Sequence, residues 1–454
     1  MNEPIISVSG LRGIVGESLT PEIAMRYIAA FVSGLPQGGS IVLTRDGRVS
    51  GPMLARAIAS VLEASGFNVL YADVAATPTT GILVRQLKAV AGIQISASHN
   101  PPPYNGIKLF GADGRVISAS AGQAVIEAYR SGQNKFVGVD GLGNWTEVRD
   151  TVSAHLQRVL NTINGDLIRK RGFKVVLDSN HGAGSVLGKI LLQELGCQAE
   201  ILGDVPDGKF AHPPEPTAAN LQSVAERSKS FGADVVFCQD PDADRLAIID
   251  EQGHYIGEEY TLALTLDHAL SQTDARGKTV VTNCSSSRMS ADIAAKYGAI
   301  YATSAVGEAN VTGKMIETNA VYGGEGNGGP IDPRVGFVRD SFAAMAQVLD
   351  LMAKRNEPVS TLVANLPRYQ IFKSTVALPR NAVPELLEKL SKEFPSARSD
   401  TQDGLRLDWP DKWLLVRPSN TEPIVRAIAE AKSMSDAEQL CRRTAELAES
   451  CSPG

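Results

Sequence analysis

Short runs of apolar residues alternate along the chain with longer segments in which apolar positions recur every three or four residues. The first pattern is typical of buried strands and the second of amphipathic helices. Such a repeat predicts three related α/β/α domains with mixed, mostly parallel sheets, whose polar loops follow the strand ends. The repeated unit is strand, polar loop, helix, glycine and strand, and its first strands are predicted at residues 40–43, 174–177 and 279–282.

The last part of the chain has a different pattern and predicts a smaller C-terminal α+β domain. Residues 370–378 alternate between apolar and polar, which is typical of a strand with one exposed face. A helix is predicted at residues 383–393, strands at 405–407 and 413–416, and a final helix from the Ser435 and Glu438 capping pair. The domains expected from these patterns are residues 1–150, 151–255, 256–367 and 368–454.

The composition, with 43% hydrophobic and 21% charged residues, is that of a globular protein. A chain of 454 residues is too long to fold around one hydrophobic core, so several domains are expected. The net charge of −6 offers no basic surface for nucleic acid. Five cysteines without paired spacing argue against a disulfide framework or zinc site. The first residues show no signal-peptide pattern, and no apolar run is long enough to span a membrane. We therefore expect a cytoplasmic monomer or homodimer with no nucleic-acid or membrane partner.

A polar stretch of residues 96–101 follows the apolar run 89–95, at the point where a predicted strand ends. The prolines that follow prevent a ladder or a helix, so Ser98 and His99 are expected on a stiff loop. Lys108 brings a cation back near this loop, and Arg12 lies between glycines that allow a close approach to phosphate oxygens. Taken alone, these segments also fit ordinary turns.

Three aspartates alternate in the segment 240–245, after another predicted strand. Carboxylates this close together would repel one another without a cation, and oxygen ligands favour Mg²⁺. A calcium-binding EF-hand loop is an alternative, since Glu251 is at its twelfth position, but Arg245 stands where that loop needs glycine. A solvated acidic turn is the other alternative. The candidate ligands are Asp240, Asp242 and Asp244.

Two further segments carry ligand-binding chemistry. The glycine-rich run 323–329 contains Glu325 and Asn327, a carboxylate and an amide suited to sugar hydroxyls, although a flexible turn also fits. The segment 417–426 offers a phosphate cradle, with Pro423 expected in the first turn of a helix; a plain turn is the alternative. The cradle residues are Arg417, Ser419, Asn420, Thr421 and Arg426.

These motifs, in this order, make the chain similar to the α-D-phosphohexomutase superfamily over nearly its whole length. The resemblance implies four domains around a central cleft, with phosphoryl transfer through Ser98 beside His99. It implies that Ser98 phosphate and the three aspartates hold Mg²⁺, that Glu325 and Asn327 bind sugar hydroxyls, and that the cradle residues hold the phosphate that is not transferred. It places Arg12 and Lys108 near the phosphoserine and Arg245 in the cleft.

The sequence departs from many relatives at three positions. Asn327 and Gly329 stand where many relatives carry serine and histidine, so the general acid/base is left open, with Lys108 as a proton carrier. Pro241 replaces a glycine of the metal loop. The glycine-rich form, with Val306-Gly307-Glu308 upstream, is more similar to the archaeal-type phosphoglucosamine mutase branch, beside the phosphomannomutase/phosphoglucomutase branch.

The resemblance implies interconversion of hexose 6-phosphate and hexose 1-phosphate through a hexose 1,6-bisphosphate. Glucosamine phosphate is the first expectation for the sugar, with glucose and mannose phosphates as alternatives. The bisphosphate has to reorient, which suggests that the C-terminal domain rotates to close the cleft. A Mg²⁺-dependent sugar phosphatase and a non-catalytic sugar-phosphate sensor are the other classes that fit these residues.

Overall fold

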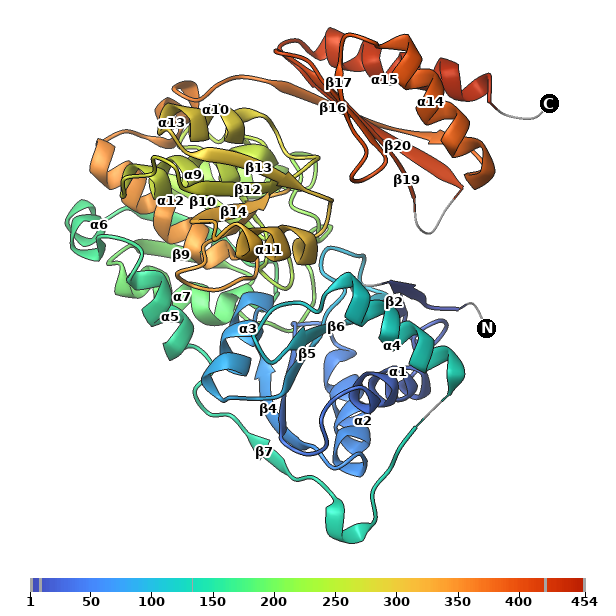
Figure 1. Ribbon diagram of the computed structural model, residues 1–454. Helices are drawn as coiled ribbons and strands as arrows, with labels where there is room; N and C mark the ends of the chain where they lie inside the picture. Colours follow the sequence, from blue (N-terminus) through green and yellow to red (C-terminus); the bar gives the residue numbers. More distant parts are fainter. Residues whose placement is uncertain (1–2, 8–9, 133, 420–422, 452–454) are drawn as a thin grey trace.

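The computed structural model describes residues 3–7, 10–132, 134–419 and 423–451. Figure 1 shows the first domain in blue, the second and third in green and yellow above it, and the C-terminal domain in red. The three predicted repeats each fold as a βαβαββ unit. The three α/β/α domains with mixed sheets and the smaller C-terminal domain are thus confirmed.

All three units have one strand order. The first strand pairs in parallel with the second and third, and the fourth returns antiparallel beside the third. The first unit comprises β3 (Ser40–Arg45), α2 (Gly51–Ala64), β4 (Asn68–Val74), α3 (Thr77–Gln86), β5 (Ala91–Ile95) and β6 (Tyr104–Gly111). The second comprises β8 (Lys174–Asp178), α7 (Gly184–Glu194), β9 (Gln198–Leu202), α8 (Gln222–Phe231), β10 (Val235–Gln239) and β11 (Leu246–Ile249). The third comprises β12 (Thr279–Asn283), α10 (Met289–Lys296), β13 (Ile300–Ser304), α11 (Glu308–Glu317), β14 (Tyr322–Glu325) and β15 (Gly329–Ile331).

Glycines end the first helix of each unit, as the repeat predicts. Gly66, Gly196 and Gly298 have φ of +84°, +67° and +70°, a left-handed conformation that glycine adopts without a steric penalty. Further elements extend the first sheet and connect the units: β1 (Ile5–Ser7), β2 (Gly10–Ile14), α1 (Pro21–Ser33), α4 (Ala119–Ser131), η1 (Val139–Gly141), β7 (Trp145–Glu147), α5 (Ser153–Leu160), α6 (Gly165–Arg171), α9 (Glu258–Ser271), α12 (Ser341–Arg355) and α13 (Val359–Ala364).

The C-terminal domain is an antiparallel sheet with the order β16-β20-β19-β18-β17, covered by two helices (Figure 1). The prediction of a helix after Pro423 is wrong, because a strand, β20, follows there and pairs with both β16 and β19. The last helix is capped by Ser433 rather than Ser435. The elements are β16 (Gln370–Ala377), η2 (Arg380–Ala382), α14 (Val383–Glu393), β17 (Arg398–Asp400), β18 (Leu405–Asp408), β19 (Trp413–Pro418), β20 (Ile424–Ala431) and α15 (Met434–Glu449).

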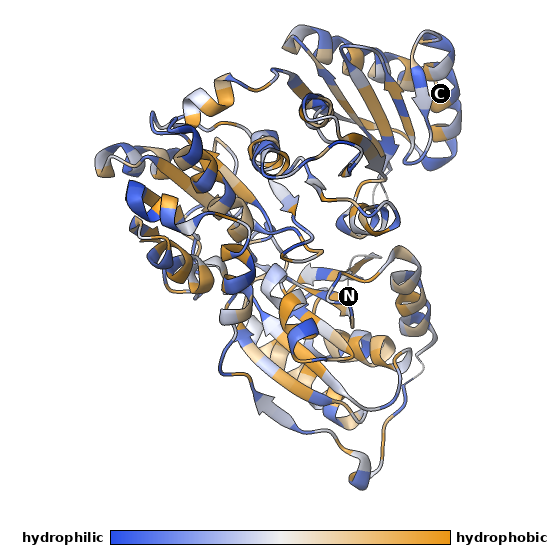
Figure 2. Ribbon diagram, turned by 60° about the vertical axis from the view of Figure 1, so that its left-hand side comes forward, coloured by the Kyte–Doolittle hydropathy of each residue, from blue (hydrophilic) through white to orange (hydrophobic). Residues whose placement is uncertain are grey.

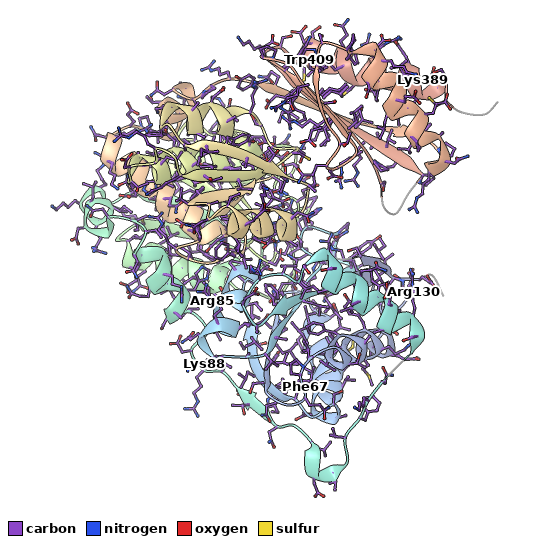
Figure 3. The ribbon with its side chains drawn as sticks, viewed as in Figure 1. Phe67, Arg85, Lys88, Arg130, Lys389 and Trp409 are labelled. Carbon is purple, nitrogen blue, oxygen red and sulfur yellow. The ribbon has the colours of Figure 1, made fainter. Side chains whose placement is uncertain are left out.

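Hydrophobic residues lie on the strands and on the helix faces that cover them (Figure 2). One core cluster joins the second and third units, with α12 between them, and includes Phe237, Tyr322 and Phe342. The first and C-terminal domains have clusters of their own. Figure 3 shows Phe67 inside the first domain and Arg130 at its surface. None of the helices in the described part of the chain combines the length and apolarity needed to cross a bilayer.

Candidate active site

Three equivalent hairpin loops meet at one place in the structure. They connect β5 to β6, β10 to β11 and β14 to β15, so each follows a parallel strand at its carboxyl end, where open α/β sheets bind ligands. Backbone hydrogen bonds join the second loop region to both other units: the Thr77 N–H, at the start of α3 in the first unit, donates to Asp242 O (2.9 Å), and the Leu246 N–H, at the start of β11, donates to Gly328 O of the third loop (2.8 Å). The repeat therefore places segments that are distant in sequence at a shared site.

Ser98 lies at the centre of this site. It is 3% exposed, and its φ of +49° is uncommon for a residue with a side chain, so the surrounding loop holds it in a strained conformation. Its Oγ donates to Asp240 Oδ2 at 2.8 Å. His99 Nδ1 and Arg245 Nη2 each lie 3.3 Å from the same Oγ. The hydroxyl is therefore in direct contact with the acidic loop of the second domain.

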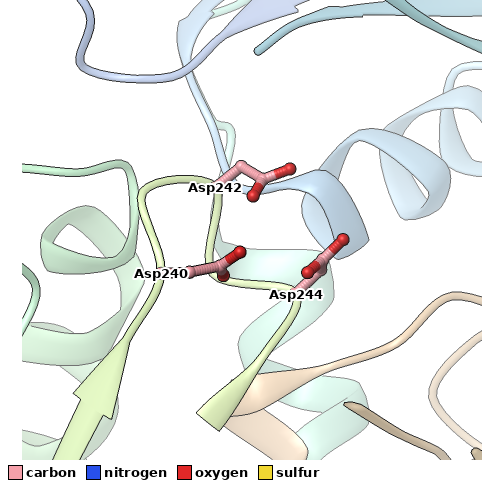
Figure 4. A group of neighbouring side chains, drawn as sticks. All are labelled: Asp240, Asp242 and Asp244. Atoms are coloured by element: carbon pink, nitrogen blue, oxygen red, sulfur yellow. The ribbon is translucent and has the colours of Figure 1, made fainter. Parts of the chain in front are cut away.

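The side chains of Asp240, Asp242 and Asp244 are fully buried and converge on one point (Figure 4). One ligand oxygen from each lies within 4.8 Å of the others. Oδ1 of Asp242 and of Asp244 are buried with no hydrogen-bond partner among the described residues. Buried carboxylate oxygens are normally satisfied, so two unpartnered ones facing a third carboxylate fit a hard divalent cation.

Cations surround these carboxylates. Lys108 Nζ donates to Oδ2 of Asp242 (2.5 Å) and of Asp244 (2.9 Å), and Arg245 Nε donates to Asp240 Oδ2 (3.2 Å). Burial and the two neighbouring carboxylates raise the pKa of Asp240 to about 7. Burial alone would also raise the pKa of Asp242, but Lys108 holds it below its ordinary value. The three carboxylates are therefore not equivalent without a metal ion.

Two more predicted residues of the first domain lie at this site. Burial, followed by the charges of Arg245 and Arg12, lowers the pKa of His99 to about 3, so its imidazole is neutral near pH 7. Arg12 Nη1 donates to Asn100 Oδ1 at 3.3 Å, on the loop that carries Ser98. His99 therefore contacts Ser98 Oγ directly, and Arg12 contacts the loop that carries Ser98.

Glu325 and Asn327 form the third side of the site. Glu325 Oε1 accepts hydrogen bonds from Asn283 Nδ2 (2.7 Å) and from the Gly307 N–H (3.0 Å). Asn327 Oδ1 is buried without a partner among the described residues, which leaves an acceptor for a ligand hydroxyl or amine.

Arg417 and Arg426 are directly opposite each other on β19 and β20, and Ser419 is buried beside them. Asn420 and Thr421 lie outside the described residues. A cleft of about 460 Å³ joins this part of the C-terminal domain to the other loops. The predicted residues that line it are His99, Arg245, Glu325, Asn327, Arg417 and Arg426.

Sequence reasoning missed two arginines of the site. Arg48, 2% exposed, donates to the carbonyl oxygens of Ser98, Asn100, Pro101 and Tyr104 and thereby holds the Ser98 loop. Arg339 contacts three carboxylates from three segments of the chain. Neither belongs to a recognisable motif, because the partners of both are distant in sequence. The one local indication of a role for Arg48 is its place in the polar loop that follows β3, the first strand of the repeat.

The chain matches four family models described as phosphoglucomutase/phosphomannomutase. They are alpha/beta/alpha domain I (residues 5–136), domain II (153–253), domain III (258–369) and the C-terminal domain (376–447).

Individual proteins agree with this match. A Thermococcus kodakarensis protein named phosphoglucomutase/phosphomannomutase is 36% identical over 437 residues, 95% of this chain and 95% of the relative. A Methanopyrus kandleri protein named probable phosphoglucosamine mutase is 33% identical over 448 residues, 98% of this chain and 97% of the relative. The structure of a phosphoglucomutase/phosphomannomutase family protein from Burkholderia thailandensis has a TM-score of 0.85 at 27% identity and covers 98% of this chain and 97% of that one. The chain therefore belongs to the phosphoglucomutase/phosphomannomutase family, within the α-D-phosphohexomutase superfamily.

Proposed function

We propose that this protein interconverts hexose 6-phosphate and hexose 1-phosphate, with Ser98 as the carrier of the phosphoryl group. The observation that supports this most directly is the contact of Ser98 Oγ with Asp240, 2.8 Å away in the buried carboxylate cluster. Arg417 and Arg426 line the same cleft from the C-terminal domain. A site for transfer and a separate site for a second phosphate are what a bisphosphorylated intermediate requires.

Asp240, Asp242 and Asp244, with a phosphate on Ser98, would hold Mg²⁺, which supplies charge neutralisation to the phosphoryl oxygens. In the first transfer the bond from phosphorus to Ser98 Oγ breaks, and a bond from phosphorus to the sugar hydroxyl oxygen forms. The sugar hydroxyl loses one proton and Ser98 gains one, so the exchange leaves the net proton count unchanged. The bisphosphate then turns, and its other phosphate returns to Ser98.

The chain's cations have separate parts in this proposal. Lys108, Arg12 and Arg245 lie around Ser98 and would stabilise the charge that spreads over the phosphoryl oxygens. Burial alone would lower the pKa of Lys108, but Asp242 and Asp244 raise it above its ordinary value. Lys108 therefore stays a cation near pH 7 and suits charge stabilisation better than proton transfer. Arg417, Ser419 and Arg426, with Asn420 and Thr421, would hold the other phosphate.

Glucosamine phosphate is the sugar that we propose first. The relative from Methanopyrus kandleri is named a probable phosphoglucosamine mutase. Glu215 lines the cleft, and its carboxylate would favour an ammonium group on the sugar. Glucose or mannose phosphate is the second candidate, supported by the name of the Thermococcus kodakarensis relative.

The test is an isomerisation assay of the purified protein primed with glucose 1,6-bisphosphate and Mg²⁺. We expect glucosamine 6-phosphate to give glucosamine 1-phosphate faster than glucose or mannose 1-phosphate gives its 6-phosphate, as followed by phosphorus NMR. Release of inorganic phosphate without isomer formation would contradict the proposal.

Replacement of the carrier tests the role of Ser98. Ser98→Ala should abolish isomerisation while hexose phosphate binding, measured by calorimetry, stays close to that of the wild type. Ser60→Ala, on the exposed side of α2, is the matched control. Unchanged isomerisation in Ser98→Ala would remove Ser98 from its role.

A further inference from the structure

Arg339 lies between β15 and α12, and its side chain is 13% exposed. Its Nη2 donates to Asp244 Oδ2 at 2.7 Å, and its Nη1 donates to Glu325 Oε2 at 2.9 Å. Its Nε donates to Glu308 Oε2 at 3.1 Å. Each nitrogen of one guanidinium thus binds a carboxylate from a different segment: the β10–β11 loop, the start of α11 and the end of β14. The first of these carboxylates is a proposed metal ligand, and the last is a proposed sugar ligand.

These contacts decide which carboxylate oxygens remain for ligands. Arg339 and Lys108 both donate to Oδ2 of Asp244, and Oδ1 of Asp244 is left buried without a hydrogen-bond partner among the described residues. At Glu325, Arg339 donates to Oε2, whereas Asn283 and Gly307 donate to Oε1. The guanidinium is planar and rigid, so it fixes the two carboxylates relative to each other.

Gly329 provides the space for this side chain. A Cβ atom at position 329 would lie 2.4 Å from Cδ, 3.0 Å from Cγ and 3.2 Å from Cβ of Arg339. These atoms form the stem of the arginine, so relieving the clash would move the guanidinium as well. A side chain at position 329 and Arg339 in its present place therefore exclude each other.

We propose that Arg339 is a positioning residue that orients the metal-binding carboxylate Asp244 and the sugar-binding carboxylate Glu325 together, and that residue 329 is glycine to leave room for it. This inference rests on the proposed function for the meaning of the sugar site. Since one side chain fixes both carboxylates, occupation of the metal site and binding of the hexose phosphate are coupled through it.

The first experiment compares Arg339→Met with Arg334→Met in the full-length protein. Arg334 pairs with the buried Asp332 in the same segment, so its loss removes a similar ion pair outside the site. Binding of Mg²⁺ alone is measured by calorimetry, and folding by circular dichroism. We expect Arg339→Met to weaken Mg²⁺ binding about 10-fold or more, as the loss of a hydrogen-bond partner of a metal ligand does, and Arg334→Met to leave it unchanged. Arg339→Lys, which reaches fewer of the carboxylates, should recover only part of the loss.

The coupling between Mg²⁺ binding and sugar-phosphate binding is measured separately, by titrating the sugar phosphate with and without Mg²⁺. In the wild type, Mg²⁺ should tighten the binding of glucose 1,6-bisphosphate, and in Arg339→Met this tightening should largely disappear. Mg²⁺ binding of Arg339→Met equal to that of the wild type would overturn the proposal. If the wild type neither binds nor isomerises hexose phosphates, the proposed function fails, but the titration with Mg²⁺ alone still tests Arg339.

The second experiment uses the exclusion between positions 329 and 339. Gly329→Ala keeps the arginine but displaces it, so we expect it to weaken Mg²⁺ binding as well. In the background of Arg339→Ala, which removes the clash, adding Gly329→Ala should have little further effect. If Arg339→Met does not fold, Gly329→Ala decides alone: unchanged Mg²⁺ binding would overturn the proposal.

Discussion

At the scale of single residues, the cleft contains a carboxyl group whose ionisation should influence stability. Glu259 lies in the cleft wall, and its Oε2 accepts a hydrogen bond from the Ser287 N–H at 2.9 Å. Burial raises the pKa of Glu259 to about 8, from an ordinary value of 4.5. Between these values the folded protein keeps a proton that the unfolded chain has released.

Stability should therefore fall with rising pH through this window, because the unfolded state binds fewer protons there. Glu259→Gln keeps the hydrogen-bond acceptor and removes the ionisation. We expect the free energy of unfolding of the variant, relative to the wild type, to rise from pH 5 to pH 8, by at most about 1.4 kcal/mol per pH unit. Urea unfolding at four pH values measures this, with Glu258→Gln as the control at a more exposed neighbour. A pH-independent difference would contradict the shifted pKa.

Single residues also show where sequence reasoning succeeds and where it ends. Ser98 and Asp240 belong to short motifs that follow predicted strands, and the structure brings them to 2.8 Å. Arg339 is no less central, but its carboxylate partners come from three other segments. A single arginine in a loop has no local pattern that indicates such partners, so a contact of this kind emerges only with the fold.

At the scale of elements, the repeat explains why the loops meet. Three βαβαββ units place equivalent hairpins at the site, and the apolar strand runs with the following glycines predicted this repeat. The prediction failed after Pro423, where local sequence suits a helix start. There β20 pairs on both sides, with β16 and β19, and this sheet pairing overrides the local preference. Such pairing joins strands distant in sequence, which local patterns do not report.

The loop that carries Ser98 depends on Arg48 for its shape. Arg48 also pairs with the buried Asp46 (Nε to Oδ2, 3.2 Å), which in turn accepts a hydrogen bond from Ser96 Oγ. Arg48→Met would leave the buried Asp46 carboxylate without its cation and several loop carbonyls without their donor. We expect this variant to lose about 3–5 kcal/mol of unfolding free energy, measured by urea denaturation, and to lose kcat because Ser98 is no longer held in place.

Arg45→Met is the matched control for Arg48. Arg45 lies three residues earlier and pairs with Asp73, whose side chain is 59% exposed, so its loss should cost about 1 kcal/mol or less. Equal losses of stability in the two variants would show that the Ser98 loop does not depend on Arg48.

At the scale of the whole molecule, the domains differ in how firmly they are joined. The second and third domains share one hydrophobic core, whereas the C-terminal domain has its own. Its contacts with the third domain combine a small apolar cluster around Trp413 with polar contacts from Arg288 and Arg406. Small, partly polar contacts between domains permit relative motion, so the C-terminal domain is the part that we expect to move when the cleft closes.

Asp403 joins the proposed phosphate site to the third domain. Its Oδ1 accepts a hydrogen bond from Arg417 Nε (3.2 Å), and its Oδ2 accepts one from the Val306 N–H (3.0 Å). Asp403→Ala removes both, so Arg417 loses its orientation and the C-terminal domain loses a link across the cleft. We expect KM for the hexose phosphate to rise about tenfold, the cost of one charge-assisted hydrogen bond, with a smaller change in kcat. Asp400→Ala is the control, because the hydrogen bond of Asp400 to Gln402 stays within the same turn. If Asp403→Ala keeps the wild-type KM, phosphate binding does not depend on the orientation that Asp403 gives to Arg417.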